Sequence, residues 1–409
     1  MEEWKEYKLE ELSKGKGAYG IGASAVPFSK NKFTYLRITD INDDGTLNKN
    51  GLMSVDDEDA NKYVLCKNDI VFARTGNSTG RSYFYDGTDG ILVYAGFLIK
   101  FSLDEKRVNP RILKYYTHSK PYYDWVKSFD TGGTRGNINA KTYGAMPILL
   151  PPRNVQDRIV EILKSLDDKI EVNRRINEQL EELAQALFKS WFVDFEPFKD
   201  GEFVESELGM IPEGWKVTKL DEVCSYISRG LTPKYDNDSD EIILGQTCVR
   251  NNIVTLNNGR KHRPKKKNEK WLQQWDVLIN STGVGSLGRV GIVYFDKDNV
   301  AIDSHITVVR PISSLYKHYI GRTLLNKQAE IENMAIGSTG QTELPKDSVK
   351  SMLILLPIDD ILVLFNKSIE PICKLMYSNL EEITQLSNLR DTLLPKLMSG
   401  EIDVNEVEI

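Results

Sequence analysis

The sequence predicts an α+β protein in which two globular domains, related by a pseudo-two-fold arrangement, are separated by an antiparallel pair of long coiled-coil helices. Three observations lead to this prediction: a long amphipathic segment, a second copy of that segment, and a repeat of the sequence that precedes each copy. The chain has 409 residues, which is enough for two or three domains.

The first long segment runs from Asn154 to Phe192 and contains neither glycine nor proline. Its apolar residues recur at alternating intervals of three and four, which is typical of a coiled-coil seam. At 1.5 Å per residue such a helix is roughly 55 Å long. The second copy runs from Asp360 to Met398, and an interval of 206 residues relates the two copies. Each copy is therefore expected to bury its apolar stripe against the other.

The residues before each helix repeat as well. Trp4 to Leu12 matches Trp215 to Val223, and Asn68 to Gly76 matches Trp275 to Gly283. The interval is far too long for a solenoid, so a whole domain and its helix are duplicated. Short β-rich runs, with expected helices over 111–127 and 315–333, make each domain α+β.

The repeat divides the chain into six expected segments. They are a first domain (1–150), a first long helix (151–192), a linker (193–214), a second domain (215–356), a second long helix (357–399) and a tail (400–409). A parallel helix pair would force the linker to retrace roughly 55 Å and become nearly taut. An antiparallel pair leaves the linker relaxed and is favoured.

Asn173 and Asn379 occupy the midpoints of the two seams. They are expected to meet and form a buried polar pair that fixes the helix register. The alternative is that both side chains point to water.

Composition limits the function. The net charge of −6 and a pI near 5.5 argue weakly against nucleic-acid binding, although a local basic surface can override the mean. Four scattered cysteines suggest neither a zinc site nor disulfides, which fits a reducing cytoplasm. The start of the chain does not look like a signal peptide, and the longest apolar run contains Asp359 and Asp360, so no membrane span is expected.

Residues Gly283 to Gly288 satisfy the GxGxxG pattern of dinucleotide-binding loops. A dinucleotide fold requires a helix there, yet the following residues continue as a strand, so a glycine-rich hairpin is the favoured interpretation. The four histidines lack metal-ligand spacing, and no catalytic constellation is evident. We expect no enzyme activity, metal or cofactor in this chain.

One dense basic cluster lies in the second repeat, near Trp271 and Trp275. It is interpreted as a phosphate-binding surface; the alternative is a solvated loop. Its residues are Arg260, Lys261, Arg263, Lys265, Lys266 and Lys267. Weaker candidates stand beside glycines or turns: Lys14, Lys16, Arg74, Arg81, Arg135 and Arg289.

Several segments carry a resemblance to a known family. They are 187–197 (LFKSWFVDFEP), 211–215 (IPEGW), 337–344 (GSTGQTEL) and 389–401 (LRDTLLPKLMSGE). Together with the repeat, they resemble the specificity subunits of type I restriction-modification systems. The resemblance implies two target recognition domains that each read one half of an asymmetric, split site on double-stranded DNA.

The resemblance also implies partners. The helices would act as a ruler and dock two methyltransferase (modification) subunits, and restriction subunits would join the complex. S-adenosylmethionine, ATP and Mg would belong to those partners, which would methylate adenine. Docking residues are expected at the end of the first helix: Phe188, Trp191, Phe192 and Phe195.

Differences between the repeats indicate where DNA specificity lies. Residues 13–67 and 224–274 share almost nothing, so the two half-sites should differ. Two other functions stay open: a nucleotide-dependent enzyme that uses the Gly283–Gly288 loop and dimerises through its helices, and a coiled-coil scaffold without DNA binding.

Overall fold

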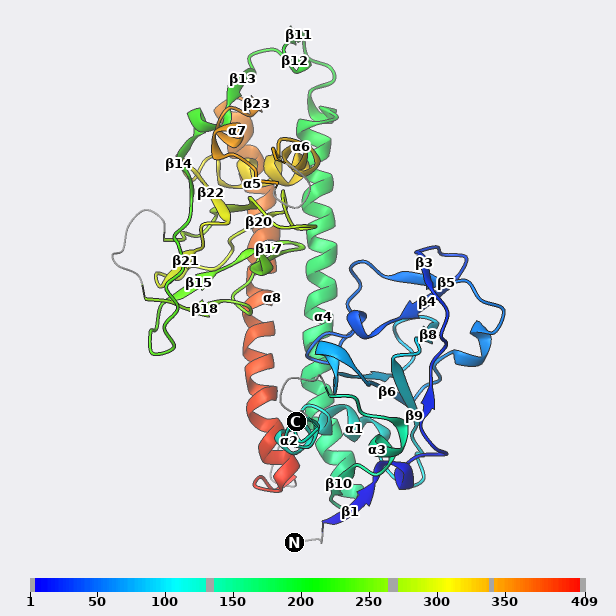
Figure 1. Cartoon of the computed structure of the whole chain (residues 1–409). Helices are drawn as coiled ribbons and strands as arrows, with labels where there is room; N and C mark the ends of the chain where they lie inside the picture. Colours follow the sequence, from blue (N-terminus) through cyan, green and yellow to red (C-terminus); the bar gives the residue numbers. More distant parts are fainter. Residues whose placement is uncertain (1–3, 130–135, 264–270, 338–341, 405–409) are drawn as a thin grey trace. The chain divides into compact units, whose positions relative to one another are not determined.

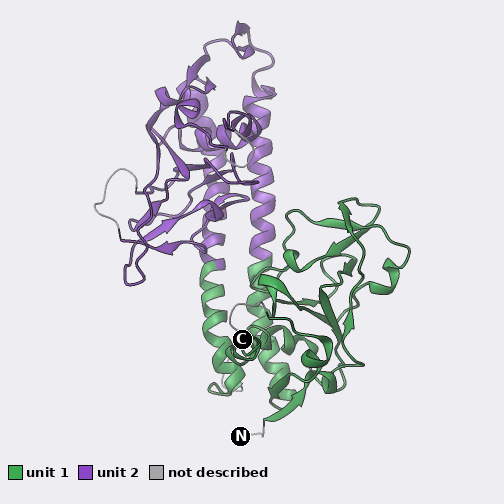
Figure 2. Cartoon of the chain, viewed as in Figure 1, with its two compact units in different colours: residues 1–171, 384–409 green, residues 172–383 purple. Residues whose placement is uncertain are grey.

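The computed structural model describes residues 4–129, 136–263, 271–337 and 342–404 (Figure 1). The chain forms two compact units (Figure 2). Unit 1 comprises residues 1–171 and 384–409, and unit 2 comprises residues 172–383. Each unit therefore includes part of both long helices.

The two long helices are α4, Arg153–Phe192, and α8, Asp359–Ser399. They run antiparallel within each unit. In unit 2, Phe188 near the end of α4 packs against Phe365 near the start of α8, with ring centroids 6.3 Å apart. In unit 1, Asp167 and Arg390 form an ion pair of 3.1 Å. The predicted α+β fold with an antiparallel helix pair is confirmed.

Unit 1 contains two four-stranded sheets beside a terminal strand pair. One sheet has the order β2-β9-β6-β7; because its strands contain more residues, we call it the larger sheet. The other, the smaller sheet, has the order β3-β5-β4-β8, in which β4 and β8 are parallel. The elements are β1 (Lys5–Lys8), η1 (Leu9–Leu12), β2 (Ala18–Tyr19), β3 (Ala25–Pro27), β4 (Phe33–Leu36), η2 (Ile38–Asp40), β5 (Met53–Val55), η3 (Ala60–Tyr63), β6 (Asp69–Ala73), η4 (Gly76–Ser78), β7 (Ser82–Tyr85), β8 (Leu92–Tyr94), β9 (Leu98–Ser102), α1 (Pro110–Tyr116), α2 (Lys120–Lys127), α3 (Ala140–Gly144) and β10 (Pro147–Leu150).

Unit 2 contains a six-stranded sheet, β14-β22-β19-β20-β17-β16, and a three-stranded sheet, β18-β15-β21. The elements are η5 (Glu196–Phe198), β11 (Phe203–Ser206), β12 (Gly209–Pro212), β13 (Lys216–Lys219), η6 (Leu220–Val223), β14 (Cys224–Arg229), β15 (Ile242–Leu244), η7 (Gln246–Cys248), β16 (Val249–Arg250), β17 (Asn252–Val254), β18 (Arg260–Lys261), β19 (Val277–Asn280), β20 (Val290–Ile292), β21 (Val300–Ile302), β22 (Ile306–Pro311), α5 (Lys317–Asn326), α6 (Gln328–Asn333), α7 (Lys346–Lys350) and β23 (Leu353–Leu356).

The repeat in the sequence corresponds to a repeat in strand pairing. β1 pairs with β10 in unit 1 as β13 pairs with β23 in unit 2, both antiparallel. β4 and β8 are parallel, as are β15 and β21. Gly20 and Gly230 are equivalent, because a Cβ on either would meet backbone carbonyls at 2.2–2.3 Å. These close contacts explain why glycine stands at both positions.

The linker folds as part of unit 2 rather than as a plain connection. β11 and β12 form a hairpin, and the preceding Phe195 and Phe198 pack on Trp215, with ring centroids 5.7 and 5.1 Å away. Within the described ranges, no helix combines the length and apolar character needed to cross a membrane.

Candidate nucleic-acid interface

In unit 1, Arg74 lies at the end of the larger sheet, directly after the buried strand β6. Its guanidinium lies over the ring of Tyr19, with Cζ 5.0 Å from the ring centroid. The Nε of Arg74 is buried and has no hydrogen-bond partner in the described part of the chain. Phe97, in the turn between β8 and β9, accepts a 3.1 Å hydrogen bond from the Arg74 backbone N–H and is 59% exposed.

The other unit 1 candidates are not gathered around Arg74. Lys14 and Lys16 are exposed on the segment before β2. Arg81 pairs with Asp43 at 2.6 Å and donates to the carbonyl of Ile41, so it ties a loop to the sheet. Arg135 lies outside the described residues.

In unit 2, the basic strand β18 forms one edge of the three-stranded sheet. Arg260 stacks on Tyr235, with Cζ 4.0 Å from the ring centroid, a favourable cation–π distance. Lys261 is exposed beside it. Arg263 is instead paired with Asp236 at 2.5 Å. Lys265, Lys266 and Lys267 lie outside the described residues.

The glycine-rich loop joins β19 to β20 as an antiparallel hairpin. No helix follows the third glycine, since β20 begins at Val290. Arg289 donates a 2.6 Å hydrogen bond to the carbonyl of Gly285 and so closes its own loop. This hairpin lacks the geometry of a dinucleotide-binding site, which leaves the nucleotide-dependent alternative without structural support.

Two histidines lie where burial disfavours the charged form of the imidazole. Burial lowers the pKa of His118 and that of His318 to about 4. His318 also shares a 2.7 Å hydrogen bond with Glu370, whose own pKa falls to about 2 because Lys317 and His318 outweigh the effect of burial. In the part of the chain that the structure describes, no three His, Cys, Asp or Glu residues gather as metal ligands would.

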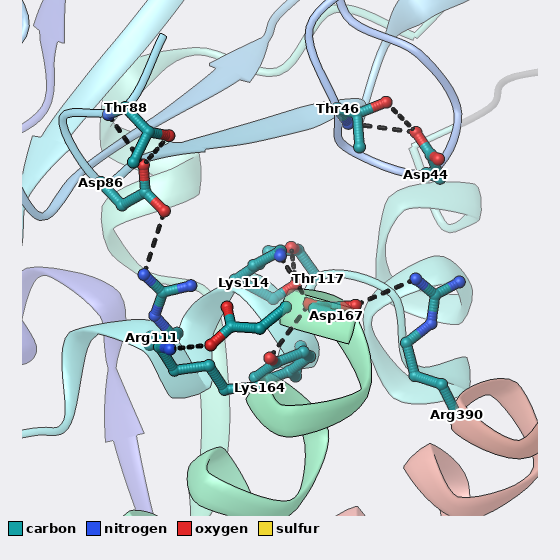
Figure 3. Close-up of polar contacts among 12 residues, drawn as sticks. Asp44, Thr46, Asp86, Thr88, Arg111, Lys114, Thr117, Lys164, Asp167 and Arg390 are labelled. Carbon is teal, nitrogen blue, oxygen red and sulfur yellow. Dashed lines mark hydrogen bonds and ion pairs between the residues drawn. The ribbon is translucent and has the colours of Figure 1, made fainter. Parts of the chain in front are cut away.

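A polar cluster joins α1 to the helix pair in unit 1 (Figure 3). Asp167 on α4 accepts hydrogen bonds from Lys114 Nζ at 2.6 Å, from Tyr115 Oη at 3.1 Å and from Arg390 Nη1 at 3.1 Å. Burial opposes ionisation, but the two cations lower the pKa of Asp167. Nearby, Arg111 is paired with Asp86 at 3.0 Å. These contacts join α1 to both long helices within unit 1. Lys114, Arg111 and Arg390 are therefore each paired with a carboxylate.

The seam asparagines are both buried but do not pair with each other. Asn173 donates to Glu382 at 2.7 Å, and Asn379 donates to Asn177 at 2.9 Å. Asn177 also donates to the carbonyl of Met376 at 3.1 Å. The expected direct pair is therefore wrong, because the actual register places Asn177, one turn after Asn173, opposite Asn379.

The aromatic residues expected to dock a partner lie inside unit 2. Phe188 and Phe192 are buried and pack against Phe365. Trp191 is partly buried against Phe365 and Phe198, and Phe195 packs on Trp215. The docking prediction is wrong for Phe188 and Phe192, since the core of unit 2 already covers both side chains.

Sequence reasoning missed Tyr19, Phe97 and Tyr235. The first two stand next to a glycine in or near a turn, and all three are at least 43% exposed. Their exposure, and the arginines that lie over the rings of Tyr19 and Tyr235, become visible only in the fold.

The chain resembles known proteins over most of its length. A family model described as the type I restriction modification DNA specificity domain matches residues 1–182 and 212–384. The MjaIX specificity subunit of Methanocaldococcus jannaschii is 28% identical over 308 residues, which are 72% of this chain and 69% of that protein. The HindI specificity subunit of Haemophilus influenzae is 24% identical across 98% of this chain and 100% of that protein.

A solved structure shows the same fold. The type I restriction-modification S subunit from M. genitalium aligns with a TM-score of 0.55 at 16% identity, over 97% of this chain and 96% of that one. Together these matches define a non-catalytic DNA-recognition component of a restriction-modification system. The chain belongs to the family of type I specificity subunits.

Proposed function

We propose that this specificity subunit reads an asymmetric, bipartite site on double-stranded DNA, with one half-site read by the surface of each unit. The observation that carries the proposal is the contrast between repeated scaffold and unrepeated surface. The strand pairs β1·β10 and β13·β23 recur, whereas residues 13–67 and 224–274, which form most of the smaller sheets, have dissimilar sequences. Different side chains on a common frame would select different bases.

In unit 2 the DNA contact would involve Arg260 and Lys261. Both are exposed on the edge strand β18, and neither has an ion-pair partner within the described ranges. Free cations on a sheet edge would bind phosphates and release counter-ions. In unit 1, Lys14, Lys16 and Arg74 would serve. Arg135 in unit 1 and Lys265–Lys267 in unit 2 stay candidates from the sequence. Arg81, Arg263 and Arg289, which are already engaged, would contribute least.

The long helices would connect the two readers and set the gap between the half-sites. A helix of 40 residues, the length of α4, extends roughly 60 Å. Two methyltransferase (modification) subunits would dock on the helix pair, and restriction subunits would complete the assembly. Exposed apolar side chains that could take part are Leu183 on α4 and Leu364 and Leu375 on α8.

The cofactors would reside in those partners: S-adenosylmethionine in the modification subunits, and ATP and Mg in the restriction subunits. The chain itself would supply position and specificity. We further infer a cytoplasmic location, where the four free cysteines would stay reduced.

The test is co-expression with the cognate modification subunit, followed by genome-wide mapping of methylated adenines. The expected result is one asymmetric motif with two halves separated by a gap of constant length. A palindromic or ungapped motif would contradict the assignment of one half-site to each unit. Absence of any new methylation by a correctly assembled complex would contradict the proposed function itself.

A further inference from the structure

A short segment of unit 2, residues 234–236, lies along the basic strand β18. Tyr235 stands opposite His262 in an antiparallel bridge. The backbone N–H of Asp236 donates a 3.3 Å hydrogen bond to the carbonyl of Lys261. The segment therefore continues the strand pairing on the side of β18 that faces away from β15.

Side chains on both flanks of Tyr235 hold this segment in place. The backbone N–H of Lys234 donates a 2.9 Å hydrogen bond to Nδ1 of the buried His262. On the other flank, Asp236 forms a 2.5 Å ion pair with Arg263. The position of Tyr235 beside β18 is thus fixed from both sides.

The ring of Tyr235 supports the Arg260 guanidinium. Cζ of Arg260 is 4.0 Å from the ring centroid, and Tyr235 is 50% exposed. The N–H bonds of a guanidinium lie in its plane, so a ring stacked on its face uses none of its donors. The stack restrains the arginine while its charge and its hydrogen-bond donors stay available.

The neighbouring arginine is restrained in a different way. Arg263 donates from Nε to the carboxylate of Asp236, which neutralises its charge and occupies one of its donors. Arg260 and Arg263 therefore stand close together in the sequence, but only the contact made by Arg260 preserves the properties that bind an anion.

The smaller sheet of unit 1 shows that this stack is not needed for the strand pairing. By the register of the strand pairs, Met53 of β5 stands where Arg260 stands in β18. Ala25 of β3 stands where Tyr235 stands, since it faces the residue equivalent to His262. The same frame thus forms in unit 1 with an alanine and a methionine at these two positions.

We propose that Tyr235 is a positioning residue that holds the Arg260 guanidinium ready to bind a phosphate of the DNA backbone. A long arginine side chain loses rotamer freedom when it binds, and a preformed stack removes part of that cost before DNA arrives. The planar fork can then meet two phosphate oxygens at once. This inference rests on the proposed function, and it confines the device to unit 2.

The test is a double-mutant cycle with Tyr235→Leu and Arg260→Ala, made in the complex with modification subunits. Binding is measured to DNA carrying the mapped site and to unrelated DNA at several salt concentrations. Tyr235→Leu should weaken binding to both DNAs roughly two- to fivefold, the range expected for an exposed cation–π contact. It should also lower the salt slope by a part of the ~0.9 expected for Arg260→Ala. In the Arg260→Ala background, Tyr235→Leu should cause no further loss.

Two variants serve as controls. Tyr235→Phe keeps the ring but not the hydroxyl and should bind both DNAs as the wild type does. Tyr123→Leu removes an exposed tyrosine of unit 1, which is 41% exposed on α2 and hydrogen-bonds His118. This variant should change neither the affinity nor the salt slope.

Equal losses from Tyr235→Leu with and without Arg260 would overturn the inference, because Tyr235 would then act independently of the arginine. Weakened binding by Tyr235→Phe, or normal binding by Tyr235→Leu, would overturn it as well. So would an Arg260→Ala complex with unchanged affinity and salt slope. If the wild-type complex still methylates a split site, these results refute the role of Tyr235 but not the proposed function; a wild-type complex that recognises no split site would refute both.

Discussion

Unit 1 and unit 2 both attach their domains to a carboxylate on α4, but they differ in the cations that pair with it. In unit 1, Asp167 of α4 pairs with Lys114 from α1 and with Arg390 from α8. In unit 2, Glu181 of α4 accepts two 2.7 Å hydrogen bonds from the buried Arg322 of α5. The Asp167 carboxylate thus pairs with two cations, whereas the Glu181 carboxylate pairs with one.

The smaller sheets of the two units differ in the charge of equivalent strands. β5 in unit 1 and β18 in unit 2 both pair antiparallel with the strand that precedes them in the smaller sheet. β5 carries Met53 and Ser54, whereas β18 carries Arg260 and Lys261. A duplicated scaffold can thus keep its strand pairing while the charge of its surface changes completely.

The largest expected effect tests the attachments. Arg322 is 2% exposed, so Arg322→Met leaves the largely buried Glu181 carboxylate without its cation, with only the amides of Asn252 and Gln185 donating to it, and should lower the free energy of unfolding by about 3–5 kcal/mol. Lys114→Met should cost about 1 kcal/mol or less, because Arg390 still pairs with Asp167. Denaturant unfolding measures both variants. Equal losses would show that the two attachments do not differ.

The next effect concerns pH. His118 and His318 have pKa values lowered to about 4 by burial, so each binds a proton more weakly in the folded chain than in the unfolded one. Their contribution to stability is present above the ordinary histidine pKa of about 6.5 and is lost as the pH falls toward 4. Each should cost about 2 kcal/mol of unfolding free energy between pH 7 and pH 5. Glu370 contributes little in this window because its pKa, lowered to about 2, lies well below it.

Single substitutions show which unit loses stability as the pH falls. His118→Gln and His318→Gln should each flatten the dependence of unfolding free energy on pH between 7 and 5. A dependence unchanged in both buried-histidine variants would contradict the assignment.

The smallest effect concerns the basic edge of unit 2. Arg260→Ala should weaken binding to specific and unrelated DNA alike and lower the salt slope by about 0.9, as expected for one lost phosphate contact. Arg263→Ala should change binding less, because Asp236 already neutralises that arginine. Met53→Ala in unit 1 should leave the slope unchanged. DNA-binding titrations at several salt concentrations measure these slopes. If Arg260→Ala weakened binding to the specific site alone, the result would instead indicate a base contact.

The repeat made the scaffold predictable. Trp4 to Leu12 includes β1 and η1, and Trp215 to Val223 includes their equivalents β13 and η6; the alternating apolar spacing identified α4 and α8. These features follow from local pattern and from chain connectivity, which the sequence contains in full.

The partners of individual side chains were less predictable. The midpoint argument placed Asn173 opposite Asn379, but packing along the seam selects Asn177 instead. Phe188 looked like a surface aromatic because nothing in the sequence shows that Tyr319 and Phe365 cover it. Likewise, Arg81 reads as a free cation until the fold brings Asp43 to it. Such contacts join residues far apart in the chain, and periodicity carries no information about them.

The composition of unit 1 has a consequence for biosynthesis. Its core includes Leu394, Leu397 and Val404, which pack with residues from the first half of the chain. All of unit 2, by contrast, lies between residues 172 and 383. In chain order, the residues of unit 2 are complete at position 383, whereas unit 1 needs residues beyond that position for its core. The unit that begins first along the chain is therefore completed by residues synthesised after all of unit 2.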